Sequence, residues 1–474
     1  MTIPMTAEAP SRGNKPYAAR IDGFRGRLIT AADPDYDSAR AVWNGTIDRR
    51  PRLIARCIGN GDVVAAVRFA REHDLEIAIR GGGHNVAGTA VCNDGLVIDL
   101  SGMRAVRVDA ADRRAWVQGG ALWGDVDQET QTHGLVTTGG IVSHTGVSGL
   151  TLGGGVGWLM RKHGLTVDNL LAVDLVTAGG ELLRASEHEH PDLFWALRGG
   201  GGNFGVVTSF DFRLHPVGPT VLAGPILWDA SDVEEVLRFY RNFVQDAPDD
   251  LGTVIRFGTA PPLPVIPEEL HWRPVVMVGT CYAGSIEDGE RVLRPLRTYR
   301  TPILDLVGPK PYVGFQSALD STVPHGWNYY WKSTHLPELG DDLIDVVAEH
   351  AFAFASPRSY VAMFHLMGAV SRVAEGSTAF GNRQASHATT IDAVWRPGED
   401  FGDRDTAWAR GFFAALDKFR EGVYVNFLGG DEDADRVREA YGDSVYNRLV
   451  EVKTTYDPDN VFHHNQNIRP RSWR

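Results

Sequence analysis

Residues 80–88 read RGGGHNVAG, and this stretch, with three consecutive glycines before His84, decides the fold. Two more glycine-rich stretches follow, at residues 139–157 and 199–205, and each is bounded by segments that alternate like strands. Glycine tolerates conformations and close approaches that a side chain forbids, and consecutive backbone N–H groups can bind an anion. One such cluster would indicate tight turns, whereas three indicate a backbone that approaches a large cofactor.

The last cluster is not a Rossmann fingerprint, although Gly200-Gly-Gly-Asn-Phe-Gly205 matches GxGxxG. That motif must open a helix and be followed by an acidic residue on a second strand. Here VVTSFDFRL follows, which alternates like a strand, and no acidic residue stands at the expected distance. The chain also has no GxxxxGK[ST] motif, so the sequence excludes a P-loop.

Composition describes an ordinary globular chain. Of 474 residues, 43% are hydrophobic and 23% are charged, and the length suits two or three domains. The net charge of −13 argues against nucleic acid or an anionic membrane as a partner. The three cysteines form no disulfide framework or zinc motif. The N-terminal residues 1–24 lack a signal-peptide core, and no apolar run is long enough to span a membrane, so we expect a cytoplasmic protein.

Three regions differ in their patterns, and together they predict an α+β fold. Residues 1–215 are glycine-rich, with short strands and helices in alternation. Residues 216–422 combine amphipathic helices with aromatic-rich strands such as WNYYWKSTHL and TTIDAVW, and we interpret them as a second domain. Residues 423–474 add a strand-like VYVNF, a long helix and a coil.

Other catalytic and metal motifs fail on spacing. His188-Glu-His190 and His463-His464 lie in polar segments that solvated loops explain. Residues 431–435 imitate an EF-hand, but Arg436 and Gly442 stand where Gly and Glu are required. Gly146-Val-Ser-Gly149 is one residue too short for a nucleophile elbow. We therefore expect no metal and no hydrolase nucleophile.

The glycine stretches carry a resemblance to a known family. RGGGHNVAG, then GGIVSHTGVSGLTLGGGVGWLMRKHGLTVDNL, then LFWALRGGGGNFGVVT, resemble the FAD domain of the vanillyl-alcohol oxidase/p-cresol methylhydroxylase (PCMH) superfamily. The tail, with YVNF and YNRLVEVKTTYDPDNVFHHNQNI, resembles the C-terminal element of its berberine bridge enzyme-like branch. The resemblance implies a two-part, PCMH-type FAD-binding domain (1–215 completed by 423–474), with residues 216–422 as an α+β substrate domain containing an antiparallel sheet.

The resemblance also implies FAD attached covalently through His84. Many relatives add a second bond from a cysteine, but Val142 stands at that position and neither Ser143 nor His144 can form a thioether. We therefore expect a single link, at His84 only. The residues expected to bind the cofactor are Arg80, Gly81, Gly82, Gly83, His84, Asn85, Gly88, Gly139, Gly140, Ser143, His144, Gly146, Gly149, Gly153, Gly154, Gly155, Gly202, Asn203, Val207, Asn465 and Gln466.

A flavin of this kind implies removal of a hydride from a carbon that bears oxygen or nitrogen, in a small organic substrate. In the family, a small residue beside the flavin leaves room for O₂, and Thr145 stands at that position. The resemblance therefore favours an oxidase that reduces O₂ to H₂O₂.

The catalytic base is predicted from the tail and the substrate domain. Tyr424 and Asn426 match a family segment near the substrate, and alternation in a strand would place both on one face, with Phe427 pointing away. A tyrosine base needs a cation to lower its pKa from about 10, and Lys332 is the candidate. Asp392, on the strand TTIDAVW, is the alternative base.

Two other functions remain open at this point. A dehydrogenase or oxygenase of secondary metabolism would keep the fold and use a different electron acceptor. A non-catalytic binding protein, in which FAD has only a structural role, would keep the glycine motifs and would need no catalytic base.

Overall fold

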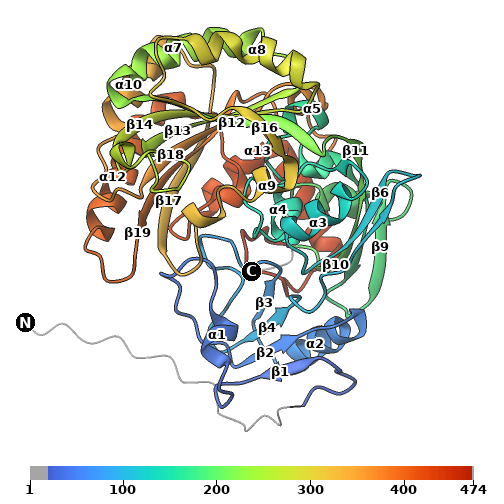
Figure 1. Ribbon diagram of the computed structural model, residues 1–474. Helices are drawn as coiled ribbons and strands as arrows, with labels where there is room; N and C mark the ends of the chain where they lie inside the picture. Colours follow the sequence, from blue (N-terminus) through green and yellow to red (C-terminus); the bar gives the residue numbers. More distant parts are fainter. Residues whose placement is uncertain (1–19, 472–474) are drawn as a thin grey trace, which may run out of the picture.

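The RGGGH loop leaves the end of a short parallel strand in a small sheet. A computed structural model describes residues 20–471, so most of the N-terminal stretch inspected for a signal peptide lies outside the described residues. The sheet has the order β1-β2-β4-β3, with β2, β4 and β3 parallel. Its elements are β1 (Arg27–Ile29), β2 (Leu53–Arg56), α2 (Asn60–Glu72), β3 (Ile77–Arg80) and β4 (Leu96–Asp99). The apolar face of α2 packs against this sheet, at the bottom of Figure 1.

A second, antiparallel sheet carries the other glycine stretches. Its order is β5-β6-β10-β8-β9, and β8 and β9 form a hairpin whose turn lies around residues 178–180. Its core also takes up side chains from residues 423–468, so the tail completes this part of the molecule. The strands are β5 (Val106–Asp109), β6 (Arg114–Gln118), β8 (Leu170–Val176), β9 (Leu182–Ser186) and β10 (Val206–Arg213).

The middle of the chain forms an eight-stranded antiparallel sheet, as predicted. Its order is β15-β12-β14-β13-β18-β19-β17, with β16 also paired to β12. The strands are β12 (Thr220–Asp229), β13 (Leu251–Thr259), β14 (Pro274–Tyr282), β15 (Leu304–Asp305), β16 (Gly308–Pro311), β17 (Asn328–Leu336), β18 (Tyr360–His365) and β19 (His387–Trp395).

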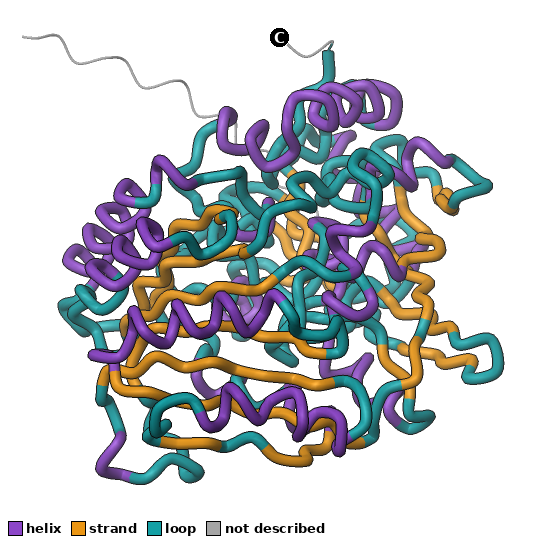
Figure 2. The backbone as a smooth tube through the Cα atoms, turned by 90° about the horizontal axis from the view of Figure 1, so that it is seen from above, coloured by secondary structure: helices purple, strands orange, loops and turns teal. Residues whose placement is uncertain are grey.

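Amphipathic helices cover one face of this large sheet. In Figure 1 α7, α8 and α10 lie above it, and Figure 2, which is seen from above, shows helices lying over the strands. Alternate residues of the strands, such as Ile255, Met363 and Ile391, pack against these helices. The opposite face turns toward the glycine loops. The covering helices are α7 (Val233–Gln245), α8 (Ile286–Thr298), α10 (Asp341–His350) and α12 (Gly402–Ala415).

Shorter elements connect the sheets. They are α1 (Tyr36–Arg40), α3 (Trp123–Gln131), β7 (Leu135–Val136), α4 (Val147–Gly153), α5 (Met160–His163), α6 (Pro191–Leu197), β11 (His215–Pro216), α9 (Tyr312–Gln316) and α11 (Ala369–Arg372). Among residues 20–471, no helix combines the length and the apolar character that crossing a bilayer requires.

The segment VYVNF is not the strand that its alternation predicts. Residues Val425–Phe427 form a turn of 3-10 helix, and Tyr424 precedes it in an extended conformation. A 3-10 turn points consecutive side chains in different directions, so the predicted two-face arrangement of this segment is wrong.

The tail is anchored by a buried ion pair. Helix α13 (Ala434–Tyr456) bends at Gly442, which has φ +69°. Near its end, Lys453 donates to Asp457 at 2.6 Å and to the carbonyl oxygens of Asn203 and Phe462 at 2.8 and 2.9 Å. Both charged side chains are fully buried. This cluster ties the tail to the glycine-rich turn before β10.

We expect Lys453→Met to lower the free energy of unfolding by about 3–5 kcal/mol, because it leaves the Asp457 carboxylate buried without its cation. Urea unfolding followed by tryptophan fluorescence measures the change. The control is Arg471→Met, whose ion pair with Glu451 is exposed on both sides and should change little. Equal effects of the two substitutions would contradict the anchoring role.

Candidate active site

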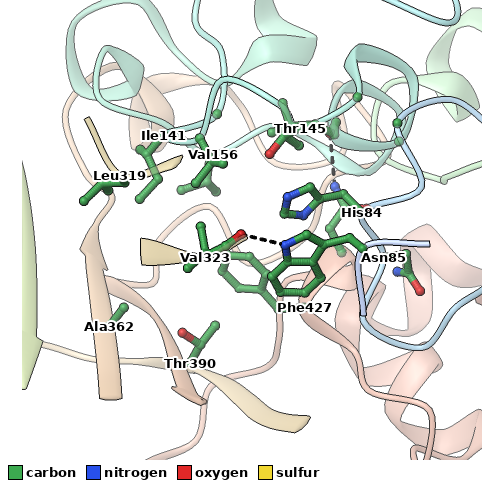
Figure 3. Close-up of a pocket in the computed structure, with 18 of the residues that line it drawn as sticks. His84, Asn85, Ile141, Thr145, Val156, Leu319, Val323, Ala362, Thr390 and Phe427 are labelled. Atoms are coloured by element: carbon green, nitrogen blue, oxygen red, sulfur yellow. Dashed lines mark hydrogen bonds between the residues drawn. The ribbon is translucent and has the colours of Figure 1, made fainter. Parts of the chain in front are cut away.

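A cavity of about 850 Å³ lies between the glycine loops and the open face of the eight-stranded sheet. Its walls come from segments far apart in sequence, as the close-up in Figure 3 shows for His84, Thr145, Thr390 and Phe427. The predicted cofactor residues that line it are Gly81, Gly82, Gly83, His84, Asn85, Gly140, Gly146, Gly149, Gly202, Asn203, Val207, Asn465 and Gln466.

Two glycine loops touch each other directly at one side of the cavity. A Cβ atom at Gly82 would collide with the backbone of Gly146, and one at Gly146 would collide with Gly82. At these two positions glycine is required by backbone packing. The contact fixes the RGGGH loop beside the start of α4.

Other predicted cofactor glycines pack against protein instead of lining the cavity. A Cβ at Gly139 would meet Trp123, and one at Gly153 would meet the amide of Asn426. Gly88, Gly139, Gly153, Gly154 and Gly155 lie outside the cavity wall, and their role in binding the cofactor stays a prediction.

Arg80, Ser143 and His144 also lie behind the wall. The Arg80 guanidinium donates to the carbonyl oxygens of Ala39 and Arg40. The backbone and hydroxyl of Ser143 both donate to Asp320, at 2.9 and 2.5 Å. None of the three lines the cavity wall, and their contact with a cofactor stays a prediction.

His84 sits at the end of the loop in a cluster of rings. Trp43 stacks on it with ring centroids 4.4 Å apart, and the Trp43 indole donates to the carbonyl of Val323 (Figure 3). The Nε2 of His84 lies 3.1 Å from Nδ1 of His144, so these nitrogens share a hydrogen bond. Burial, and then the neighbouring His144 and His325, hold the pKa of His84 well below its usual value. His84 is therefore neutral and keeps a lone pair for bonding.

The cavity fits a large planar cofactor with polar edges. A Cβ at Gly149 or Gly202 would meet no protein atom within 4 Å, so each would stand in the open cavity. The Oδ1 atoms of Asn85 and Asn465 are buried without a hydrogen-bond partner among the described residues, and both side chains line the cavity. Such atoms need a donor, which the N–H groups of a flavin or adenine supply.

No cysteine lies where a second covalent link would need it. Val142 lines the cavity, whereas Cys57, Cys92 and Cys281 are buried elsewhere. In the described residues no group of three or more His, Cys, Asp or Glu side chains is arranged to hold a metal ion.

Tyr424 and Asn426 both line the cavity, as predicted from the tail. The Tyr424 hydroxyl accepts hydrogen bonds from the backbone of Gly155 at 2.8 Å and from the Asn426 amide at 2.7 Å. Burial nevertheless raises the pKa of Tyr424 to about 12. Phe427 also lines the cavity (Figure 3), so the expectation that it points away is wrong.

Lys332 does not approach Tyr424. Strand register pairs Trp331 with Asp392 and Lys332 with Ile391, so Trp331 faces the cavity and Lys332 faces α12. There its Nζ lies 2.9 Å from both Asp431 and Glu432. The predicted role of Lys332 as the cation beside the base is therefore wrong, because strand alternation turns it to the other face.

Asp392 is the acidic group of the cavity. It lies on β19 directly opposite Tyr360 of β18, and its Oδ2 is buried without a partner among the described residues. Burial raises the pKa of Asp392 to about 7, although hydrogen bonds from Thr390 and Tyr360 and the charge of Arg256 lower it. A carboxyl that titrates near neutral pH suits a general base.

Sequence reasoning missed Arg256 and Tyr360, which also line this part of the cavity. The Arg256 guanidinium lies over the Tyr360 ring at 4.1 Å. A charged residue inside the apolar strand VIRFG was the available signal, because a strand buried on both faces rarely keeps an arginine.

Two family models match the chain at the segments that build this site. The one described as FAD binding domain matches residues 51–186, and the one described as Berberine and berberine like matches residues 423–469. These segments contain the RGGGH loop and the tail around Tyr424.

Relatives match over nearly the whole length. The chain is 33% identical over 462 residues to (R)-6-hydroxynicotine oxidase of Paenarthrobacter nicotinovorans, covering 94% of this chain and 97% of that protein. It is 32% identical over 432 residues to an FAD-linked oxidoreductase of Dictyostelium discoideum, covering 90% and 91%. The crystal structure of 6-hydroxy-D-nicotine oxidase from Arthrobacter nicotinovorans superposes with a TM-score of 0.84 at 30% identity, covering 97% of this chain and 100% of that one.

We expect Gly149→Leu to abolish flavin binding, because the new side chain would occupy the open cavity while the helix α4 tolerates leucine. Flavin absorbance per mole of purified protein measures the loss, and circular dichroism checks the fold. Gly411→Leu is the matched control, since Gly411 is an exposed helical glycine of α12 with no atom near its Cβ position. A Gly149→Leu protein with full flavin content would show that the cofactor does not lie against α4.

Proposed function

The chain belongs to the berberine bridge enzyme-like FAD-linked oxidoreductases, and we propose that this oxidoreductase is an oxidase of a small organic substrate. Residues 1–215 and 423–474 hold FAD, and residues 216–422 form the substrate side. The observation that carries the proposal is the single cavity that has neutral His84 on one wall and Asp392 on the other. When bound, FAD supplies a hydride acceptor that O₂ restores, with formation of H₂O₂.

His84 is the proposed point of covalent attachment, and the only one. The imidazole is uncharged, stands at the cavity wall, and is oriented by Trp43 and His144. The glucooligosaccharide oxidase of Acremonium strictum, similar in fold with a TM-score of 0.82 at 22% identity, carries 6-S-cysteinyl, 8α-N1-histidyl FAD. Val142 and the remote cysteines of the present chain favour the histidyl bond alone.

Asp392 is the proposed base that takes the proton from the substrate O–H or N–H. Its pKa of about 7 leaves a large fraction ionised at neutral pH, whereas Tyr424, with a pKa of about 12, stays protonated. The Tyr424 hydroxyl accepts two N–H donors, so its own proton is free to be donated to the substrate or the cofactor. Tyr424 and Asn426 are therefore assigned a positioning role.

Thr145 is the proposed neighbour of the O₂ path. It lines the cavity. Its backbone N–H donates a hydrogen bond to the carbonyl of Val142 at 3.1 Å, and its carbonyl accepts one from the N–H of Trp123 at 3.0 Å. A side chain this small leaves space beside the cofactor. A dehydrogenase or oxygenase that uses another acceptor is the alternative, and a peroxide-coupled screen of alcohols and amines separates the two: turnover with H₂O₂ release supports the oxidase.

We expect the wild-type protein to stay yellow after acid precipitation, and a tryptic digest to show flavin mass on the peptide that contains His84 alone. His84→Ala should release its flavin into the acid supernatant, because the carbon–nitrogen bond cannot form. His188→Ala, which removes an exposed histidine, is the control and should retain the label. Flavin mass on a peptide that contains Val142 would contradict the single link.

We expect the rate of anaerobic flavin reduction, with a substrate found in the screen, to rise with pH and to level off above about 7, because only ionised Asp392 accepts the proton. Asp392→Asn should slow reduction by about 10²- to 10⁴-fold and remove this limb of the profile. Tyr424→Phe is the comparison variant and should keep it. If Asp392→Asn keeps the limb and Tyr424→Phe loses it, the base is Tyr424.

A further inference from the structure

Arg256 places a cation without a salt bridge in the wall of the cavity, although the charge of Asp392 acts on it through space. It lies on β13, with its guanidinium 4.1 Å from the centroid of the Tyr360 ring. Within residues 20–471 it forms no salt bridge, and its Nε is buried without a hydrogen-bond partner. The other two nitrogens of this planar group remain available to a ligand in the cavity.

The surroundings of Arg256 make an unpaired charge costly. The neighbouring cavity wall is apolar, with Val254, Met277 and Phe364 among its members. Arginine keeps its proton in proteins, so it cannot relieve burial by becoming neutral. A buried charge is normally paired, and the missing partner of Arg256 is therefore expected to enter with the ligand.

The pairing of three neighbouring strands places both Arg256 and Asp392 beside Tyr360. Gly258 of β13 stands beside Tyr360, where a Cβ would come within 3.1 Å of the Tyr360 Cβ, and the missing side chain leaves room for the Arg256 guanidinium to fold over the ring. Tyr360 in turn lies opposite Asp392 across the β18–β19 pair. Tyr360 therefore contacts both groups, with the Arg256 guanidinium over its ring and its hydroxyl hydrogen-bonded to Asp392.

We propose that Arg256 determines specificity by binding a carboxylate of the substrate, so that the carbon to be oxidised lies near Asp392. The proposal rests on the proposed oxidase function, because it assumes that substrate occupies this part of the cavity. It assigns the substrate class as apolar carboxylic acids that carry an oxidisable alcohol or amine carbon.

A carboxylate fits this site better than a phosphate does. One guanidinium binds one carboxylate through two parallel hydrogen bonds, and the two groups neutralise each other. A phosphate dianion would bring a second negative charge into an apolar wall, close to Asp392.

The test compares two probes of equal size, 3-phenylpropanoate and 3-phenylpropanamide, by titration calorimetry on the flavin-loaded protein. We expect the carboxylate to bind about 10- to 100-fold more tightly than the amide, which is the range for a hydrogen-bonded charge. Arg256→Gln should reduce this preference to near unity, and Arg256→Lys should keep part of it. Lys310→Gln is the control, since Lys310 also lines the cavity and should leave the preference intact.

Equal binding of the two probes by the wild type would overturn the proposal, as would a preference that survives Arg256→Gln or disappears in Lys310→Gln. A change in flavin absorbance on Arg256→Gln, with no probe preference in the wild type, would assign Arg256 to the cofactor instead. Calorimetry needs no turnover, so the test is independent of the oxidase assignment. If no substrate yields H₂O₂ while the carboxylate preference holds, the oxidase assignment fails and the role of Arg256 stands.

Discussion

The contact between the backbones of Gly82 and Gly146 is the constraint on which the site depends. Neither position admits a Cβ atom, so the backbone of the RGGGH loop lies directly against the backbone at the start of α4. That approach brings His84 within 3.1 Å of His144 and leaves Gly149 facing open space on the next turn of helix. The open space for a cofactor and the position of the neutral His84 at its edge thus both depend on the contact between Gly82 and Gly146.

Strand alternation in the large sheet separates the residues that face the cavity from those that pack under the helices. Arg256, Tyr360 and Asp392 face the cavity, whereas their sequence neighbours pack under the helices. The tail closes the arrangement, since the carbonyl oxygen of Phe427 accepts hydrogen bonds from Trp331 and Ser333 of β17, both at 2.8 Å. The cavity therefore lies between the large sheet and a tail segment that is hydrogen-bonded to that sheet.

Glycine clusters and strand periodicity are local signals, and they predicted the α+β class and the glycine loops, whereas the family resemblance implied the antiparallel sheet. The sequence did not predict which glycines face the cavity: Gly149 and Gly139 look alike in sequence, and only the position of Trp123 distinguishes them. Lys332 was misplaced because the register of β17 against β19 is a long-range property. The segment around Tyr424 was predicted as a strand because an alternating sequence of only five residues is also compatible with a turn of 3-10 helix, which is the observed structure.

Burial, outweighing its hydrogen bonds, brings the pKa of Asp392 into the neutral range, while Tyr424 remains a protonated phenol. Infrared difference spectroscopy across a pH titration of the flavin-loaded protein tests the pKa of Asp392 directly, without any substrate. We expect protonated-carboxyl C=O absorbance that titrates with a midpoint near pH 7 in the wild type and that is reduced in Asp392→Asn to the part contributed by buried Asp127, whose pKa is also raised to about 7. A spectrum in which that absorbance is absent above pH 5, or is unchanged in Asp392→Asn, would contradict this pKa for Asp392.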